Sequence, residues 1–332
     1  MVRVFSGVKP TGHLTLGNYL GAMRRWAEVD QHQADALFCV VDLHALTVDH
    51  DPARVRRLSR QAATLLLAAG LDPELCTVFV QSHVDEHARL SYLLECVATD
   101  GEMRRMIQYK EKSARERERG GGSVRLSLLT YPVLMAADIL AYGTDEVPVG
   151  DDQTQHVELS RDLAVRFNQR YGHTFTVPRA TPPKVAARVM NLQDPTSKMG
   201  KSDDSGPGIV YLLDEPEAVR KKVMRAVTDS GQDVVYDRED RPGVANLLEI
   251  LAACGGGDPE ALSGEYTSYG ALKKDTAEAV VELLEPVRAR HRELCADPSY
   301  VDGVLRAGAA KAREMARPTV DAAYRAMGLL PA

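Results

Sequence analysis

The sequence lacks the features that would place it in several common classes of protein. Its five cysteines, at 39, 76, 96, 254 and 295, are scattered and form no CxxC pair, which argues against a disulfide framework and a zinc cluster. No apolar run approaches the ~18 residues of a membrane span. The N-terminus, MVRVFSGVKP, has no stretch long enough for a signal peptide. We therefore expect a cytoplasmic protein.

Aromatic residues are also scarce, and acidic residues outnumber basic ones. Aromatics make up 5% of the chain, with Trp26 the only tryptophan, although 44% hydrophobic residues are sufficient for an ordinary globular core. The formal net charge is −6, so the molecule as a whole repels polyanions. Any nucleic-acid contact must come from local basic patches, which argues against a general nucleic-acid-binding protein.

Short apolar runs alternate with helical patterns in the first half of the 332 residues. The pattern predicts strands at 2–6, 36–41 and 76–80, and helices at 18–29 and from Asp51-Pro52 to Gly70. Such alternation is typical of βαβ units and a parallel sheet, on which ligands bind beyond the carboxyl ends of the strands.

The second half has a different pattern. Residues 111–119 are highly charged and precede three glycines, which predicts a mobile excursion. From about residue 178 the strand signal fades, and helices are expected at 214–227, 243–253, 273–298 and 303–326. The chain is long enough for two structural units. The sequence thus predicts an α/β nucleotide-binding domain with a helical domain appended.

A glycine-rich segment at 7–21, GVKPTGHLTLGNYLG, follows the first strand and opens the next helix. Backbone N–H groups and the helix dipole at such a position suit a polyphosphate. It is neither a P-loop nor a dinucleotide loop, because Asn18-Tyr19 stands where Lys-Ser/Thr is needed and GxGxxG is absent. A simple glycine-rich turn with an N-cap asparagine is the structural alternative.

A polar loop at 197–203, SKMGKSD, carries two lysines three positions apart, Lys198 and Lys201. Their side chains can reach β- and γ-phosphates, where charge builds as pyrophosphate leaves, and positioned cations stabilise such a transition state. An ordinary solvated loop is the alternative. The two segments in this order favour nucleotide chemistry more than either does alone.

A helical pattern over 130–142 places Tyr131, Met135, Asp138 and Tyr142 on one face. A carboxylate among aromatic and thioether groups suits an indole, whose ring nitrogen can only donate a hydrogen bond. An amphipathic helix whose aspartate makes a structural ion pair fits this pattern equally well.

The segment 147–156, VPVGDDQTQH, predicts a strand that ends in glycine before a helix start with acidic and amide side chains. These groups suit ribose hydroxyls and an α-amino group. Asp151, Asp152 and His156 could also form a metal site. Because carboxylates crowded at a helix start are more often caps, no protein-held metal is predicted.

These segments together resemble the bacterial tryptophanyl-tRNA synthetases, which are class I aminoacyl-tRNA synthetases. TLGN at 15–18 resembles the HIGH motif, and SKMGKS resembles KMSKS; FSG, VDLHALT, YKEKS, LLTYPVLMAADIL, VPVGDDQTQH and VTDS extend the resemblance over nearly the whole chain. It implies a Rossmann-like parallel-sheet catalytic domain over 1–178, with a helix at about 302–330 packed back on it. It also implies an α-helical anticodon-binding domain over 179–301 that includes the lysine loop.

The resemblance implies a tryptophan–tRNA ligase. Such an enzyme activates L-tryptophan with ATP to tryptophanyl-adenylate and pyrophosphate, and then transfers tryptophan to the terminal adenosine of tRNA(Trp). It implies Mg²⁺ held mainly through the ATP phosphates, a homodimer, and neither membrane nor DNA as a partner. The alternatives are a tyrosyl-tRNA synthetase, a small nucleotidyltransferase with the same HIGH loop, and a synthetase-like binding protein without aminoacylation.

The resemblance also assigns roles to individual residues. Asp138 receives the indole N–H, and the full tryptophan set is Phe5, Gly7, His44, Tyr131, Met135, Asp138, Val147, Val149 and Gln153. The nucleotide set is Lys9, Thr11, Gly12, Gly17, Asn18, Gly150, Asp152, Gln153, Val189, Lys198, Met199, Lys201 and Ser202. The catalytic set is Thr15, Asn18, Lys112, Lys198 and Lys201.

Two positions depart from the family pattern: Lys9, where many relatives carry glutamine, and Gly200 inside the lysine loop. We expect the extra cation at Lys9 to alter sensitivity to tryptophan-like inhibitors, and unchanged inhibition of Lys9→Gln would refute this. Basic residues that could meet tRNA, each also compatible with a solvated helix face, are Arg104, Arg105, Arg115, Arg117, Arg125, Lys221, Lys222, Arg225, Lys273 and Lys274.

Overall fold

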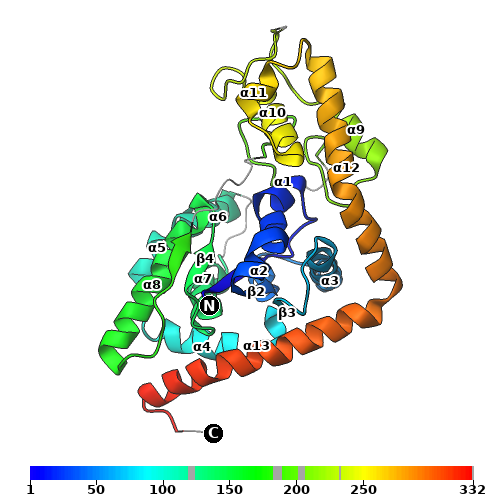
Figure 1. The fold of residues 1–332 in the computed structure, drawn as a ribbon. Coiled ribbons are helices and arrows are strands. Elements are labelled where there is room, and N and C mark those ends of the chain that lie inside the picture. Colours follow the sequence, from blue (N-terminus) through cyan, green and yellow to red (C-terminus); the bar gives the residue numbers. More distant parts are fainter. Residues whose placement is uncertain (119–123, 182–188, 201–205, 232, 331–332) are drawn as a thin grey trace.

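The structure, a computed structural model, describes residues 1–118, 124–181, 189–200, 206–231 and 233–330 (Figure 1). Five parallel strands form one sheet in the order β3 (Thr77–Val80), β2 (Asp35–Val40), β1 (Arg3–Val8), β4 (Glu146–Pro148) and β5 (Arg179–Thr181). The three strands expected in the first part and the one before Gly150 are confirmed. A short edge strand at 179–181, beside β4, was not among the strands predicted from the sequence.

The strand order places a topological switch point between β1 and β4. The chain builds outward from β1 to β2 and β3, and then returns to β4 on the other side of β1. At such a point the connections leave the sheet in opposite directions, so a crevice opens beyond the carboxyl ends of the two strands. The parallel Rossmann-like sheet predicted from the sequence is confirmed.

Both faces of the sheet are covered, as parallel sheets require. An apolar core lies on each face of the sheet, and side chains along β2 alternate between these two cores. Ala36 and Phe38 pack on one face, and Leu37 and Cys39 pack on the other. The first core includes α3 (Pro52–Ala68), and the second includes α4 (Glu86–Glu95), α7 (Leu126–Leu140) and α8 (Asp151–Tyr171).

The first helical segment runs from Leu16 to Gln33 as α1 (Leu16–Asn18), two π-helical turns (Tyr19–Met23 and Trp26–Asp30) and α2 (Gln31–Gln33). This confirms a helix over 18–29, although periodicity alone gave no sign of the π turns. Asp51 caps α3 by accepting hydrogen bonds from the N–H groups of Ala53 and Arg54. Gly70, at φ 105°, ends that helix in a conformation that favours glycine.

The charged stretch after residue 107 is helical. It forms α6 (Ile107–Glu118), which follows α5 (Asp100–Arg105). The expected mobile excursion was therefore wrong for 111–118, where hydrogen bonds between neighbouring turns, such as Lys112 Nζ to Gln108 Oε1 at 2.9 Å, support a helix. The glycines at 120–122 lie outside the described residues.

The second half is helical, as predicted, with boundaries shifted by several residues. It comprises α9 (Pro216–Met224), α10 (Pro242–Gly255), a short unpredicted α11 (Pro259–Ser263), α12 (Tyr269–Ala296) and α13 (Pro298–Ala326). The helices α9 and α10 pack on α12, which also contacts α3. After Asp297 the chain turns, and α13 runs back across β3 and α4 (Figure 1).

The apolar core of α9, α10 and α12 is continuous with the α3 face of the sheet, and the domain boundary at 178/179 stays a prediction. Within the described ranges, no helix is both long and apolar enough to cross a bilayer.

Candidate active site

A cavity of about 690 Å³ lies at the carboxyl ends of β1 and β4. Its volume is within the range of small-molecule sites. The walls come from the end of β1, the start of α1, α6, α7, the end of β4 and the 189–199 loop. The predicted site residues that line it are Phe5, Gly7, Lys9, Gly17, Asn18, His44, Lys112, Tyr131, Met135, Asp138, Val147, Val149, Gly150, Gln153, Val189, Lys198 and Met199.

The remaining predicted site residues are not among those that line the cavity. Thr11 and Gly12 belong to the turn after β1, and Thr15 is buried at the start of α1. The side chain of Asp152 and the residues Lys201 and Ser202 lie outside the described part of the chain. Their roles stay predictions.

The start of α1 is fixed by a capping box between Thr15 and Asn18. The hydroxyl of Thr15 accepts from the backbone N–H of Asn18 at 3.3 Å, and Oδ1 of Asn18 accepts from the backbone N–H of Thr15 at 3.1 Å. Because Oδ1 is held in this way, the amide NH₂ of Asn18 is the group left to donate toward a ligand. A direct bond from Thr15 to phosphate would have to replace contacts within the cap.

Gly17 brings the two family motifs together. A Cβ at Gly17 would lie 3.3 Å from the backbone oxygen of Met199, closer than nine in ten real Cβ contacts. The backbone N–H of Met199 in turn donates a hydrogen bond to the carbonyl oxygen of Val189 at 3.1 Å. The space beside Gly17 thus faces the lysine loop, and the role of Gly17 in binding the nucleotide stays a prediction. Lys198, exposed and lining the cavity, is thereby placed near the helix start.

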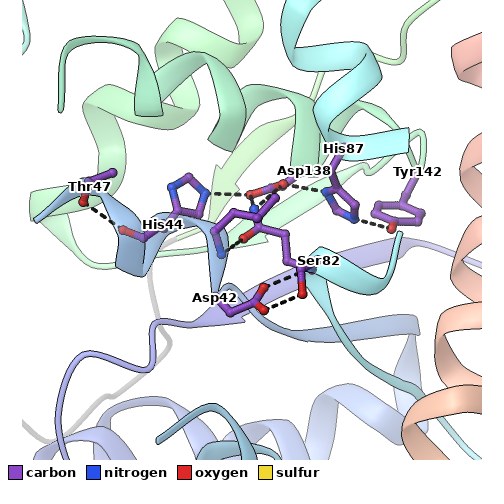
Figure 2. A network of polar contacts seen from close by, with 9 residues as sticks. Asp42, His44, Thr47, Ser82, His87, Asp138 and Tyr142 are labelled. Atoms are coloured by element: carbon purple, nitrogen blue, oxygen red, sulfur yellow. Dashed lines mark hydrogen bonds and ion pairs between the residues drawn. The ribbon is translucent and has the colours of Figure 1, made fainter. Parts of the chain in front are cut away.

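The apolar part of the cavity ends at a buried carboxylate, Asp138, which is 1% exposed. Figure 2 shows the polar contacts around this carboxylate. Its Oδ1 accepts from Nε2 of Gln81 at 2.8 Å and Nδ1 of His87 at 2.6 Å. Its Oδ2 accepts from Nε2 of Gln81 at 2.8 Å and Nε2 of His44 at 2.8 Å. The second nitrogen of His87 contacts the hydroxyl of Tyr142 at 2.7 Å.

The charge of Asp138 is stabilised by this network. Burial by itself would raise the pKa of the carboxyl, but the electrostatic interaction with His87 and hydrogen bonds from His44 and His87 outweigh it and hold the pKa at about 2. The two alternatives left open by the sequence are therefore combined: the acid is held by structural partners, and it also lines the cavity.

Polar side chains line the cavity next to its apolar part. The hydroxyl of Tyr131 donates to Oε1 of Gln108 at 3.2 Å and lies 2.9 Å from Nε2 of His156. Lys112 lies 5.1 Å from the centre of the Tyr131 ring. Burial raises the pKa of Tyr131, so its hydroxyl stays protonated and can donate.

Two cations, Lys9 and Lys112, face these polar side chains. Nζ of Lys9 lies 3.3 Å from the hydroxyl of Thr47. Burial, and secondarily the charge of Lys112, lowers the pKa of Lys9 to about 8. A bound anion would relieve both effects, so this part of the cavity suits a carboxylate or phosphate.

Sequence reasoning missed Gln81 and His87, and it placed Tyr142 on one helix face with Asp138 without giving it a role. Gln81 follows the buried strand β3, at the sheet edge where ligands bind, and that position was an available signal. The helix α7 ends at Leu140, and Tyr142 is buried behind the cavity wall, in contact with His87.

The fold and the site define an α/β enzyme that acts on a nucleotide, because the cavity at the switch point joins a glycine-rich helix start to a lysine loop. The chain belongs to the class I tRNA synthetases (W and Y), whose family profile matches residues 1–285. It is therefore an aminoacyl-tRNA synthetase.

Relatives of known name agree with this family. The chain is 87% identical over 332 residues, the whole of both chains, to tryptophan–tRNA ligase 1 of Streptomyces avermitilis. It is similar to the tryptophanyl-tRNA synthetase structure of Mycoplasma pneumoniae, with 38% identity, a TM-score of 0.91 and coverage of 99% and 98% of the two chains. The enzyme of Campylobacter jejuni, solved in complex with ADP and tryptophan, gives 32% identity, a TM-score of 0.84 and coverage of 99% and 100%.

Proposed function

We propose that this chain is a tryptophan–tRNA ligase that forms tryptophanyl-adenylate from L-tryptophan and ATP. The observation that carries the proposal is the ionised Asp138 at the end of an apolar cavity lined by Phe5, Met135 and Val147. An indole fills such a space with a flat ring and offers one N–H donor to the carboxylate. Two tryptophan–tRNA ligases of Streptomyces, each 87% identical to this chain over 100% and 98% of their own lengths, support the same substrate.

Tryptophan and ATP would meet along the cavity. Tyr131 and Gln153, which line the cavity, would hold the amino group, and Lys9, which also lines it, would face the carboxylate. Val189 and Met199 would contact adenine, and Gly150 with Asp152 the ribose. Asn18, Lys112, Lys198 and Lys201 would hold the phosphates. Among the described residues of the cavity wall, Asp138 is the only carboxylate, and its oxygens are already bonded. This donor set fits Mg²⁺ carried by ATP oxygens and water.

The reaction then depends on position and charge. A carboxylate oxygen of tryptophan attacks the α-phosphorus of ATP, and the bond from that phosphorus to the β-phosphate bridging oxygen breaks to release pyrophosphate. Lysines stabilise the charge on the leaving group. In the second step a ribose hydroxyl of the tRNA terminal adenosine attacks the activated carbonyl and AMP leaves. The class implies the 2′-hydroxyl.

The finer assignments belong to the same proposal. We propose tRNA(Trp) as the acceptor, anticodon recognition by the helical half, a homodimer and a cytoplasmic location. The family membership supports them.

Amino-acid-dependent exchange between ATP and pyrophosphate tests the activity. We expect exchange with tryptophan and none with tyrosine, and charging of tRNA(Trp) by the same preparation. Tyrosine-dependent exchange would make the chain a tyrosyl enzyme, and absence of exchange with either would leave a binding protein.

Asp138 can be tested by substitution. We expect Asp138→Ala, and the more conservative Asp138→Asn, to lower kcat/KM for tryptophan by about 10³-fold or more, because a charged acceptor for a buried donor is lost. ATP binding, measured by calorimetry on the same variants, should change far less. An equal loss of both would contradict the role of Asp138 in recognising the indole.

A further inference from the structure

We propose that His87, backed by Tyr142, is a positioning residue that sets the preference for a substrate ring bearing an N–H group. The inference rests on the proposed function, and it concerns residues that do not line the cavity. His87 is 0% exposed and Tyr142 is 1% exposed. Their influence on a ligand must therefore pass through the side chains they contact, and the polar part of it passes through Asp138.

The hydrogen bonds of Asp138 separate its two oxygens. Each carboxylate oxygen has two in-plane acceptor positions. Those of Oδ1 are taken by Gln81 and His87, neither of which lines the cavity. Oδ2 is also bonded to Gln81, and to His44, which does line the cavity. Figure 2 shows His44 and His87 on opposite sides of the carboxylate. Oδ2 is thus the oxygen on the cavity side, where a substrate N–H would share it with His44 and Gln81.

The hydroxyl of Tyr142 fixes which nitrogen of His87 carries the proton. In a neutral imidazole one nitrogen donates and the other accepts. A donor on Nδ1 matches Oδ1 of Asp138 at 2.6 Å, and Nε2 then accepts from the hydroxyl of Tyr142 at 2.7 Å. The buried chain of donors runs from Tyr142 through His87 to Asp138. Without the hydroxyl, the proton could move to Nε2, and a lone pair on Nδ1 would then face the carboxylate.

Ring contacts connect His87 and Tyr142 to the cavity wall. His87 lies 5.5 Å from the ring of Tyr142 and 6.0 Å from that of Phe79, measured between centres. Phe5, which lines the cavity, stacks on Tyr142 at 5.8 Å with an interplanar angle of 13°. Tyr142 therefore supports both the apolar wall and the hydrogen-bond acceptor that the substrate ring would meet.

The test compares tryptophan with its analogue in which sulfur replaces the ring N–H, 3-benzothienylalanine. The ratio of the two kcat/KM values in ATP–pyrophosphate exchange measures the N–H preference. We expect His87→Leu to lower that ratio about tenfold, which is the effect of losing one hydrogen bond to a buried charge. The kcat/KM for tryptophan should fall, and that for the analogue should not. Tyr142→Phe should lower the ratio about threefold by the same relation. His87→Asn, which keeps a donor near the Nδ1 position, should restore most of it.

Phe79→Leu is the matched control, because it loosens the same packing and removes no polar group. It should reduce stability and leave the ratio unchanged. Equal losses for both substrates in the His87 and Tyr142 variants, or an unchanged ratio, would overturn the proposal and leave these residues structural. If His87→Leu does not fold, the ratios measured for Tyr142→Phe and His87→Asn test the proposal. A wild-type protein that fails to activate tryptophan would instead refute the proposed function.

Discussion

At the scale of single residues, the cavity wall holds a buried carboxylate, Asp138, and a half-buried ammonium group, Lys9. The fold stabilises the first charge and destabilises the second. Asp138 has several donors around it, and they keep its pKa at about 2 despite burial. Lys9 has the hydroxyl of Thr47 at 3.3 Å, and burial together with Lys112 lowers its pKa to about 8. The charge of Asp138 is therefore stabilised before any ligand binds. An incoming anion would stabilise the charge of Lys9.

Lys9→Gln should accordingly stabilise the ligand-free protein at pH 7. The pKa of Lys9 falls from 10.5 to about 8 on folding, so between those values the unfolded chain binds more protons and wild-type stability rises with pH. Below pH 8 both states are protonated and the full cost of burying the charge remains. We expect the variant to be more stable by about 1–3 kcal/mol at pH 7, and the advantage to shrink as the pH rises toward 10.5. Urea unfolding of both proteins across this range measures it, and a constant difference would count against the shift.

At the scale of elements, α13 joins the end of the chain to the sheet through a face of small residues. Ala309, Ala312, Ala316, Val320 and Ala323 are buried along it. Alanine permits a helix to approach a strand closely, and glycine permits an even closer approach. At Gly308 a Cβ would lie 1.9 Å from the carbonyl oxygen of Val78 in β3. Backbone contact at this position, and not helix propensity, selects glycine.

Gly308→Ala is therefore expected to destabilise the protein, although alanine is the better helix former by about 1 kcal/mol. A backbone clash of this kind should cost about 2 kcal/mol or more. Gly303→Ala on the same helix is the control, because nothing lies within 4 Å of its added Cβ, and it should be neutral or stabilising. Thermal unfolding of the two variants gives the comparison. Similar effects at both positions would show that α13 does not pack on β3 as described.

At the scale of the whole molecule, a net charge of −6 opposes the approach of tRNA. Several of the basic residues considered for this contact already have acidic partners: Arg104 bonds to Asp100 at 2.8 Å, and Lys222 to Asp214 at 2.6 Å. Contacts with tRNA at these positions stay predictions. Binding must depend on a few local phosphate contacts, and such contacts release counterions and weaken as salt rises.

Raising the salt concentration should therefore separate the two steps of the reaction. Between about 50 and 200 mM salt we expect KM for tRNA to rise at least about tenfold, as a few phosphate contacts require. Tryptophan-dependent ATP–pyrophosphate exchange should change far less, because its contacts are enclosed within one cavity. Parallel exchange and aminoacylation assays measure both, and an equal salt dependence would place the sensitive contacts in the adenylate site instead.

The sequence by itself determined the fold class, the order of its elements and most residues of the cavity wall. Strand and helix periods, turn residues and short motifs act over a few neighbouring positions, and β1, the glycine-rich segment and the strand before Gly150 were found in this way. Long-range packing decided the rest, including the short strand β5 and the position of Tyr142 behind the cavity.

The partners of Asp138 are the clearest case of what only the tertiary structure decided. Gln81, His44 and His87 lie 57, 94 and 51 positions away along the chain. No local pattern says which donors will share the oxygens of one buried carboxylate. That is settled when folding brings these side chains together and each buried polar group must find a partner.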